Sequence, residues 1–205
     1  MYNFILTEIF NQNVMLFYMI NHGLDNNLFD FIMPLITNFG SVIAWAGICG
    51  LLFIFGGEKG KKVAILGLAA LFISNVIVYL LKFIIAEPRP FLALHNVDLL
   101  VTESEAYSFP SGHTASSFAA ATIIGLKYKF NFKEKSYRLI YPLLAFAGVI
   151  GFSRIYIGVH YPLDVLFGAI VGIVSALLAL KVEDNIFVDK LTHTCLLDEL
   201  NQEKI

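Results

Sequence analysis

The sequence predicts an all-α protein whose helices cross a membrane several times. Of its 205 residues, 58% are hydrophobic and only 15% are charged, whereas a soluble domain carries roughly 25% charged residues. Several apolar stretches approach the roughly 20 residues that a helix needs to cross a bilayer. Because backbone in lipid must satisfy its own hydrogen bonds and no alternating β pattern appears, we read each stretch as a helix. We therefore expect a multi-pass bundle of five spans, or six if the N-terminal segment also crosses.

Composition and charge exclude three other classes of protein. A net charge of −2 gives no basic surface for nucleic acid. Cys49 and Cys195 are the only cysteines and sit in unrelated contexts, which argues against a disulfide scaffold. So apolar a chain is not disordered, and its length leaves no room for a second domain. We expect residues 1–205 to form one integral-membrane domain.

The first 38 residues differ from the predicted spans. Polar residues such as Glu8 and Asn13 interrupt the segment, while Ile9, Leu16 and Ile20 fall near one helical face. This pattern favours a helix that lies in the membrane interface. A second short apolar piece, Leu28–Ile36, leaves open whether residues 1–38 enter the membrane.

Five spans are predicted after this interfacial segment, within residues 39–181. The first is slightly short but uncharged, and residues 182–205 follow the last as a mixed-charge cytoplasmic tail, plausible as a short amphipathic helix. The spans are Phe39–Gly56, Val63–Ile85, His113–Tyr128, Leu139–Tyr156 and Leu163–Leu180.

Lysine and arginine residues orient the bundle. Eight of them fall in the first and third connections between spans, which lie on one side of the membrane, and cytoplasmic connections carry such an excess. We expect this side to be cytoplasmic and the first 38 residues, which contain no Lys or Arg, to lie outside the cell membrane. The eight are Lys59, Lys61, Lys62, Lys127, Lys129, Lys133, Lys135 and Arg138.

The opposite, outer ends of the spans collect cations suited to a phosphate. An ionisable residue at membrane depth costs roughly 2.5–3.5 kcal/mol on insertion scales, so it is a functional candidate. Lys82, Arg89 and Arg154 offer point-charge and forked donors that match phosphate oxygens. Ser111, a fitting N-cap, and Gly112 precede a helix whose free N–H groups and dipole favour an anion. These five residues are the predicted phosphate site.

Two histidines and an aspartate accompany these cations. His160 is a candidate nucleophile and His113 a candidate general acid, because imidazole titrates near neutral pH. Asp164 stands four residues after His160, where it can orient the ring as in a catalytic triad. Carboxylates are not spaced as metal ligands, so we expect no metal and no cofactor, with the cations neutralising phosphate charge instead.

Two further patterns allow more than one interpretation. Asn75 and Tyr79 share the helical face of Lys82, so they either line a cleft or hydrogen-bond between helices; the second is slightly favoured. Gly168-x3-Gly172 resembles a dimerisation motif. Within a bundle it more often permits close packing of neighbouring helices, so a homo-oligomer stays open.

Three motifs together resemble the signature of the type 2 phosphatidic acid phosphatase superfamily. They cover Lys82 to Asp164, about two-fifths of the chain. The resemblance implies a catalytic core at residues 82–164, in which His160 becomes a phosphohistidine, Asp164 holds its other ring nitrogen and His113 protonates the leaving oxygen and then activates water. It also implies that phosphate is held, without metal, by Lys82, Arg89, Ser111, Gly112 and Arg154. The motifs are Lys82-x6-Arg89-Pro90, Pro110-Ser111-Gly112-His113 and Ser153-Arg154-x5-His160-x3-Asp164.

The expected function is that of a lipid phosphatase with its active site on the extracytoplasmic face. The outer connections are short, so little stands above the membrane to select a soluble substrate. Small size, the N-terminal segment and the run Glu87–Phe91 resemble bacterial polyprenyl-diphosphate phosphatases, which favours undecaprenyl diphosphate as substrate. Phosphatidate or phosphatidylglycerophosphate is the alternative. A non-catalytic lipid-phosphate binder or transporter is disfavoured, because both histidines are present and no internal repeat or broken midplane helix is found. Expected partners are the lipid substrate and membrane lipids.

Overall fold

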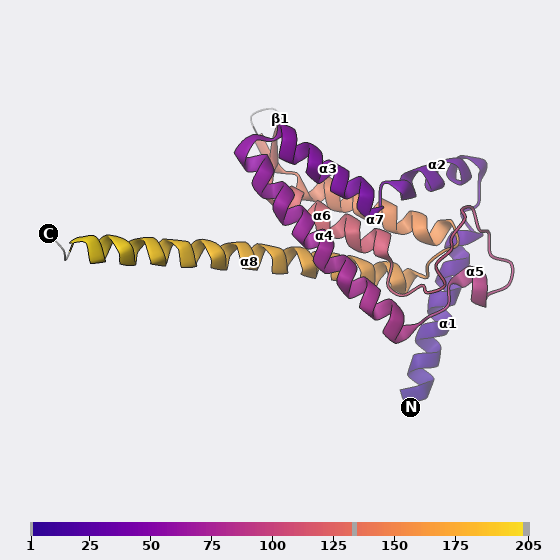
Figure 1. The fold of residues 1–205 in the computed structure, drawn as a ribbon. Helices are drawn as coiled ribbons and strands as arrows, with labels where there is room; N and C mark the ends of the chain where they lie inside the picture. The colour runs from indigo at the N-terminus through magenta and orange to yellow at the C-terminus, as the bar shows by residue number, and fades with distance from the viewer. Residues whose placement is uncertain (1, 133–134, 203–205) are drawn as a thin grey trace.

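The computed structural model describes the backbone of residues 2–132 and 135–202 and the side chains of residues 7–130 and 136–184. The fold is a bundle of helices (Figure 1), in agreement with the predicted all-α class. In chain order the helices are α1 (Tyr2–Asn21), α2 (Asn27–Asn38), α3 (Val42–Phe55), α4 (Gly57–Ile85), α5 (Pro90–Ala93), α6 (Gly112–Lys127), α7 (Ile140–Tyr156) and α8 (Pro162–Gln202).

A small β-hairpin, which the sequence analysis did not predict, joins α6 to α7. Strand β1 (Lys129–Phe132) pairs antiparallel with β2 (Lys135–Arg138), in the register that places Lys129 opposite Arg138. The predicted cytoplasmic connection therefore contains two short paired strands. Lys133 and the side chain of Lys135 lie outside the described residues.

Helix length and composition identify membrane-crossing elements. Among the described residues, α4 and residues 162–184 of α8 are each long and apolar enough to cross a bilayer. Helices α2 and α3 meet the same test only as a pair, bent by 56°. With 14 residues α3 is about 21 Å long, short of the roughly 30 Å of a hydrocarbon core. The predicted span Phe39–Gly56 is thus the second half of a bent pair.

Two of the remaining helices begin and end close to their predicted bounds, whereas α4 begins six residues earlier than predicted and α8 ends later. Helices α6 and α7 match the predicted spans His113–Tyr128 and Leu139–Tyr156 to within one residue at each end. They have only 16 and 17 residues, so their lengths do not by themselves fix the number of spans. Helix α8 continues past the predicted end at Leu180 and projects from the bundle as far as Gln202 (Figure 1), where a separate amphipathic helix was expected.

Helix α6 is the centre of the bundle and packs against α4, α7 and α8. Its small residues, such as Ala115 and Ala119, are fully buried and let α8 approach closely. A Cβ atom added at Gly168 of α8 would lie 2.6 Å from the Ser111 carbonyl oxygen, and one at Gly172 would collide with the Ala115 carbonyl oxygen. The Gly168-x3-Gly172 motif therefore packs α8 onto α6 within the chain.

Helix α1 docks against α7 and α8 through the polar residues that interrupt its apolar pattern. Asn13 is buried and accepts a hydrogen bond from the Leu163 N–H at 3.0 Å. Asn21 is also buried and donates to the Asp98 and Tyr156 carbonyl oxygens at 2.9 and 2.8 Å. These contacts attach the N-terminal helix to the end of the bundle where α8 begins.

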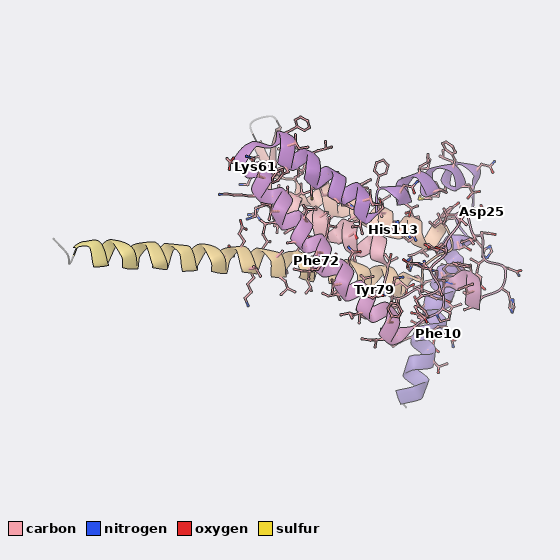
Figure 2. The ribbon with its side chains drawn as sticks, in the orientation of Figure 1. Phe10, Asp25, Lys61, Phe72, Tyr79 and His113 are labelled. Carbon is pink, nitrogen blue, oxygen red and sulfur yellow. The ribbon has the colours of Figure 1, made fainter. Side chains whose placement is uncertain are left out.

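The lysines gather at the opposite end of the bundle, where α4 begins and α6 ends. Lys59, Lys61 and Lys62 lie in the first turns of α4, because only Gly56 separates this helix from α3. At the end of α6, Lys127 forms an ion pair of 2.7 Å with Glu183 of α8. Figure 2 shows Lys61 at one end of α4, with Tyr79 and His113 far along the bundle from it. The predicted division between a lysine-rich end and an active-site end is present in the fold.

Candidate active site

A cavity of about 410 Å³ lies where α4 ends, α6 begins and α7 ends. It is also bordered by the start of α3, through Ser41, Val42 and Ile43, and by the connection between α5 and α6. Six of the eight predicted site residues line it: Lys82, Arg89, Gly112, His113, Arg154 and His160. The other two, Ser111 and Asp164, lie buried directly behind this lining.

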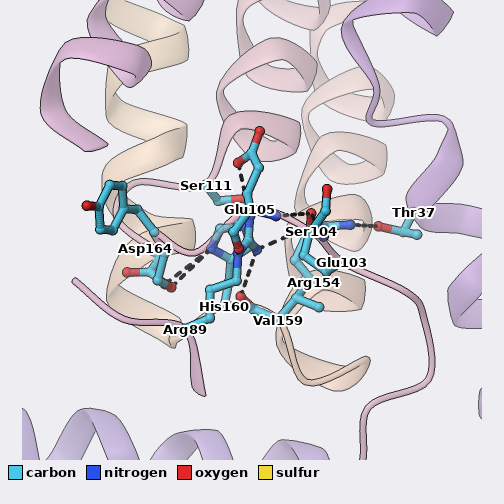
Figure 3. Close-up of polar contacts among 12 residues, drawn as sticks. Thr37, Arg89, Glu103, Ser104, Glu105, Ser111, Arg154, Val159, His160 and Asp164 are labelled. Carbon is cyan, nitrogen blue, oxygen red and sulfur yellow. Dashed lines mark hydrogen bonds and ion pairs between the residues drawn. The ribbon is translucent and has the colours of Figure 1, made fainter. Parts of the chain in front are cut away.

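His160 is held by the tight turn between α7 and α8. Gly158 adopts a left-handed conformation (φ 86°), and the N–H of His160 donates to the Arg154 carbonyl oxygen at 3.3 Å. The imidazole is buried, and its Nδ1 lies 3.2 Å from Oδ2 of Asp164 in the first turn of α8. The i, i+4 spacing across the start of α8 thus becomes a direct contact (Figure 3).

The other ring nitrogen of His160 faces a cation. Nη1 of Arg89 lies 3.3 Å from Nε2 of His160. A guanidinium only donates hydrogen bonds, so Nε2 must be the acceptor and the ring proton resides on Nδ1, toward Asp164. Burial lowers the pKa of the His160 imidazole well below its usual value, and the charges of Arg154 and Arg89 lower it further. The ring is neutral, and its unprotonated Nε2 accepts from Arg89 at the lining of the cavity.

Backbone carbonyls fix Arg89 in place. The N–H of Arg89 donates to the Ala106 carbonyl oxygen at 3.3 Å. This bond joins the segment after α4 to the segment before α6. Its guanidinium donates to the carbonyl oxygens of Val159 at 3.1 Å and Glu105 at 2.6 Å. The side chain is 1% exposed, so this cation is held rigidly beside His160.

The two other cations approach from helix ends. Lys82, in the last turn of α4, donates to the Tyr107 carbonyl oxygen at 2.6 Å. Arg154, in the last turn of α7, donates to Oγ1 of Thr37 in α2 at 3.1 Å, a contact that the sequence did not suggest. Nε of Arg154 is buried and has no hydrogen-bond partner within the described part of the chain. The site therefore retains a donor for an anion.

Two carboxylates from the connection before α6, those of Glu103 and Glu105, lie near Arg89 and Arg154 (Figure 3). Oε2 of Glu103 is 3.0 Å from Nη2 of Arg154 and 3.5 Å from Nη1 of Arg89. Oε2 of Glu105 is 3.0 Å from Lys82 Nζ and 3.1 Å from Nη2 of Arg89. Neither glutamate was predicted from the sequence to be a counter-charge to these cations. Buried cations require such counter-charges, and both glutamates lie in the connection that precedes α6.

Glu105 is ionised in this setting. Burial alone would raise the pKa of its carboxyl, but hydrogen bonds and charges from Lys82 and Arg89 together lower that pKa below its usual value. The cavity therefore contains cations that are already paired with an anionic group.

Ser111 takes the predicted N-cap position of α6. Its Oγ caps α6, accepting hydrogen bonds from the N–H of Thr114 at 3.4 Å and from Oγ1 of Thr114 at 2.9 Å. Its own N–H donates to the Asp164 carbonyl oxygen at 3.0 Å. The predicted N-cap is confirmed, and the hydroxyl ties the start of α6 together while Gly112 and His113 reach the cavity.

Ser108 is a further site residue that was not predicted from the sequence. It is fully buried, its Oγ forms a short hydrogen bond to Oδ2 of Asp164, and it lies 3.4 Å from Nδ1 of His160. The N–H of Tyr161 donates to the same Asp164 oxygen at 2.8 Å. Asp164 is thus oriented by two donors besides the histidine.

Asn75 both lines the cavity and forms a hydrogen bond between helices, the two roles that the sequence left open. Together with Tyr79 it lines the cavity. Its Nδ2 also donates to Oγ of Ser116 in α6 at 3.2 Å. Across the described residues, no three or more His, Cys, Asp and Glu side chains form a cluster suited to a metal ion.

Known proteins resemble the chain over most of its length. Residues 63–187 match the PAP2 superfamily. Undecaprenyl-diphosphatase BcrC of Bacillus subtilis is 36% identical over 82% of this chain and 84% of its own length. An undecaprenyl-diphosphatase of Sulfolobus acidocaldarius is 30% identical over 83% of this chain and 78% of its own. The crystal structure of Aquifex aeolicus LpxE has a TM-score of 0.70 and 34% identity, covering 83% of this chain and 95% of that one.

Proposed function

The chain belongs to the PAP2 superfamily and is a membrane-embedded lipid phosphatase, and we propose that it hydrolyses undecaprenyl diphosphate to the monophosphate and phosphate. Catalysis proceeds through a phosphohistidine at His160 and needs no metal ion. The proposal rests on one observation above all. His160 lies between Asp164 and Arg89, which fixes the proton on Nδ1 and leaves Nε2 as a lone-pair donor toward the cavity.

In the first step, Nε2 of His160 attacks the terminal phosphorus. The N–P bond forms while the P–O bond to the lipid monophosphate breaks, and His113 gives its proton to the leaving oxygen. Asp164 stabilises the positive charge that develops on the His160 ring. His113 is suited to this role because it lines the same cavity from the start of α6.

In the second step, water attacks the phosphohistidine. His113, now neutral, takes a proton from the water as the new P–O bond forms and the N–P bond breaks, which releases phosphate and restores His160. Lys82, Arg89, Arg154 and the N–H groups at Gly112 bind the phosphoryl oxygens throughout, and charge stabilisation of this kind supplies most of the catalysis in phosphoryl transfer. Ser111 contributes by capping α6 and so placing Gly112 and His113.

The cations take the place that a metal would otherwise have. Three positive side chains line one cavity, and the Arg154 Nε–H has no hydrogen-bond partner among the residues that the structure describes. A phosphate dianion bound there is neutralised without Lewis-acid assistance. We expect excess chelator to leave the rate unchanged, and a loss that magnesium restores would contradict this part of the proposal.

Two observations support a polyprenyl diphosphate as substrate. The relatives from Bacillus subtilis and Sulfolobus acidocaldarius, each matched over more than four-fifths of this chain, are undecaprenyl-diphosphatases. In addition, one rim of the cavity is formed by Val42, Ile43 and Tyr79, which are 42%, 84% and 62% exposed on α3 and α4. An isoprenoid chain attached to the bound phosphate would leave the cavity over this apolar rim and enter the bilayer.

The domain and its orientation are part of the same proposal. We propose that residues 1–205 act as one domain with the catalytic core at 82–164, and that the site opens on the extracytoplasmic face of the cell membrane. The lysine-rich end of α4 and α6 lies away from the cavity, as the positive-inside rule requires. A reporter fused after residue 205 should be read out in the cytoplasm.

Phosphate release from a panel of lipids in detergent tests the function. Purified protein should release phosphate fastest from undecaprenyl diphosphate and more slowly from phosphatidate and phosphatidylglycerophosphate. Preference for either phospholipid would replace the substrate assignment. Release from none of the three, with lipid still bound, would instead favour a non-catalytic binder or transporter.

A further inference from the structure

The cavity already contains an internal anion. Oε2 of Glu103 bridges Arg154 and Arg89, and Oε2 of Glu105 bridges Arg89 and Lys82. Each carboxylate oxygen thus takes two of the contacts that a phosphoryl oxygen would take. Together the two carboxylates carry the charge of a phosphate monoester dianion. A substrate phosphate that takes over the contacts of Arg89, together with those that the glutamates make to Lys82 and Arg154, must therefore displace both glutamates.

The glutamates are not needed to hold the cations in position. Lys82 and Arg89 also donate to the carbonyl oxygens of Tyr107, Val159 and Glu105. Arg154 is tied to Thr37 of α2. Because the backbone carbonyls and the threonine hydroxyl remain when the carboxylates leave, the arrangement of cations is preserved during the exchange.

The two side chains are also placed to move. Glu103 and Glu105 belong to an irregular connection outside the helices. The side chain of Glu105 is 63% exposed and that of Glu103 is 17% exposed, whereas Arg89 is almost fully buried. Rotation of the carboxylates toward solvent therefore needs no change in the helices that carry the cations.

We propose, on the basis of the function proposed above, that Glu103 and Glu105 determine specificity by excluding phosphodiester headgroups from the cation site. A membrane contains a large excess of phospholipids whose phosphodiester carries one negative charge. Such a group cannot replace two carboxylates without leaving a cation unpaired, whereas a terminal phosphate or diphosphate can. Displacing the two carboxylates costs free energy, which lowers the apparent affinity of the site for every anion. Because a phosphodiester also leaves a cation unpaired, the site binds it less well than a terminal phosphate and is therefore selective.

Glutamine substitutions test the proposal while preserving side-chain size. The double variant Glu103→Gln/Glu105→Gln should have a KM for undecaprenyl diphosphate about two- to tenfold lower than wild type, since partly exposed ion pairs have modest strength. Its kcat should change less than its KM. Short-chain phosphatidylglycerol should inhibit the variant, and inorganic vanadate should inhibit it at lower concentration than wild type.

Asp98→Asn is the matched control, because Asp98 lies in the same connection but pairs with His22 away from the cavity. It should leave KM and both inhibition constants at wild-type values. If the double variant also keeps wild-type KM and shows no new inhibition by phosphatidylglycerol, the proposal is wrong. If the two glutamates only stabilised the fold, the double variant would have a lower kcat and a lower melting temperature without inhibition by phosphatidylglycerol. That result would also contradict the proposal.

The single variant Glu105→Gln and the activity of the wild type distinguish failure of the exclusion proposal from failure of the proposed function. Should the double variant fail to fold, Glu105→Gln alone decides, because this mostly exposed side chain tolerates substitution and should still lower KM. If wild-type protein releases no phosphate from any lipid, the proposed function itself fails. If wild type is active and inhibited by vanadate while the glutamine variants match it, only the exclusion of phosphodiesters fails.

Discussion

Asp164 lies directly behind His160, with Oδ2 of the carboxylate 3.2 Å from Nδ1 of the ring and both side chains buried. Because Arg89 donates to the opposite nitrogen, the carboxylate and the guanidinium together define one neutral tautomer. The chemistry proposed for this lipid phosphatase depends on that tautomer, since Nε2 then carries no proton and its lone pair can attack phosphorus when substrate takes the place of the Arg89 contact.

Asp164→Asn should lower kcat by about 10²- to 10⁴-fold, as loss of the orienting carboxylate does in a catalytic triad. An amide can present an N–H to Nδ1, which would place the ring proton on Nε2, and it cannot stabilise the imidazolium. The measurement is steady-state phosphate release in detergent. A variant that retains more than half of the wild-type kcat would show that Asp164 does not orient the nucleophile.

Ser108→Ala should lower kcat by about tenfold with little change in KM, because a charge-assisted hydrogen bond to the Asp164 carboxylate is lost while the phosphate site remains. Ser104→Ala, at an exposed serine of the same connection, serves as the control and should behave as wild type. Equal activity of the two variants would remove Ser108 from the positioning of Asp164.

We predict that the stability of the folded protein depends on pH through the carboxyl group of Glu87. Burial raises the pKa of its carboxyl to about 7, and the negative charge of Asp164 contributes. The folded state then holds a proton that the unfolded chain releases near pH 4.5, so stability falls as pH rises between these two values. Wild-type melting temperature in detergent should decline from pH 5 to pH 7.5 relative to Glu87→Gln. Parallel curves for the two proteins would contradict the assignment.

Gly172→Ala should destabilise the bundle by about 1–3 kcal/mol, because the added methyl group collides with the Ala115 carbonyl oxygen and forces α8 away from α6. Gly148→Ala is the matched control, since a Cβ at this position of α7 meets no atom within 4 Å. Thermal unfolding in detergent should separate the two variants. Similar melting temperatures would mean that close packing at Gly172 contributes little.

The sequence was most informative where function depends on helix ends. Lys82, Arg154 and His113 sit in the first or last turn of an apolar helix, so their spacing along the chain predicts their meeting at one end of the bundle. The same reasoning placed Asp164 one helical turn after His160. These contacts follow from helix geometry and motif order alone.

Features that depend on irregular backbone were not predictable in this way. Glu103, Glu105 and Ser108 reach the site through a connection without periodicity, so nothing in their spacing indicated which side chains turn inward. Thr37 contacts Arg154 only because α2 and α3 form a bent pair. Strand β1 after α6 alternates polar and apolar residues over only four positions, too few to distinguish a strand from a loop.

Identification of the phosphorylated residue during turnover tests the mechanism most directly. Undecaprenyl diphosphate carrying a radiolabelled terminal phosphate is mixed with wild-type enzyme, and the reaction is quenched in alkali, which preserves phosphohistidine. We predict label on the peptide that contains His160, formed faster than phosphate release and absent from His160→Ala. Phosphate release without a covalent intermediate, label on another residue, or continued turnover by His160→Ala would contradict the mechanism proposed for this enzyme.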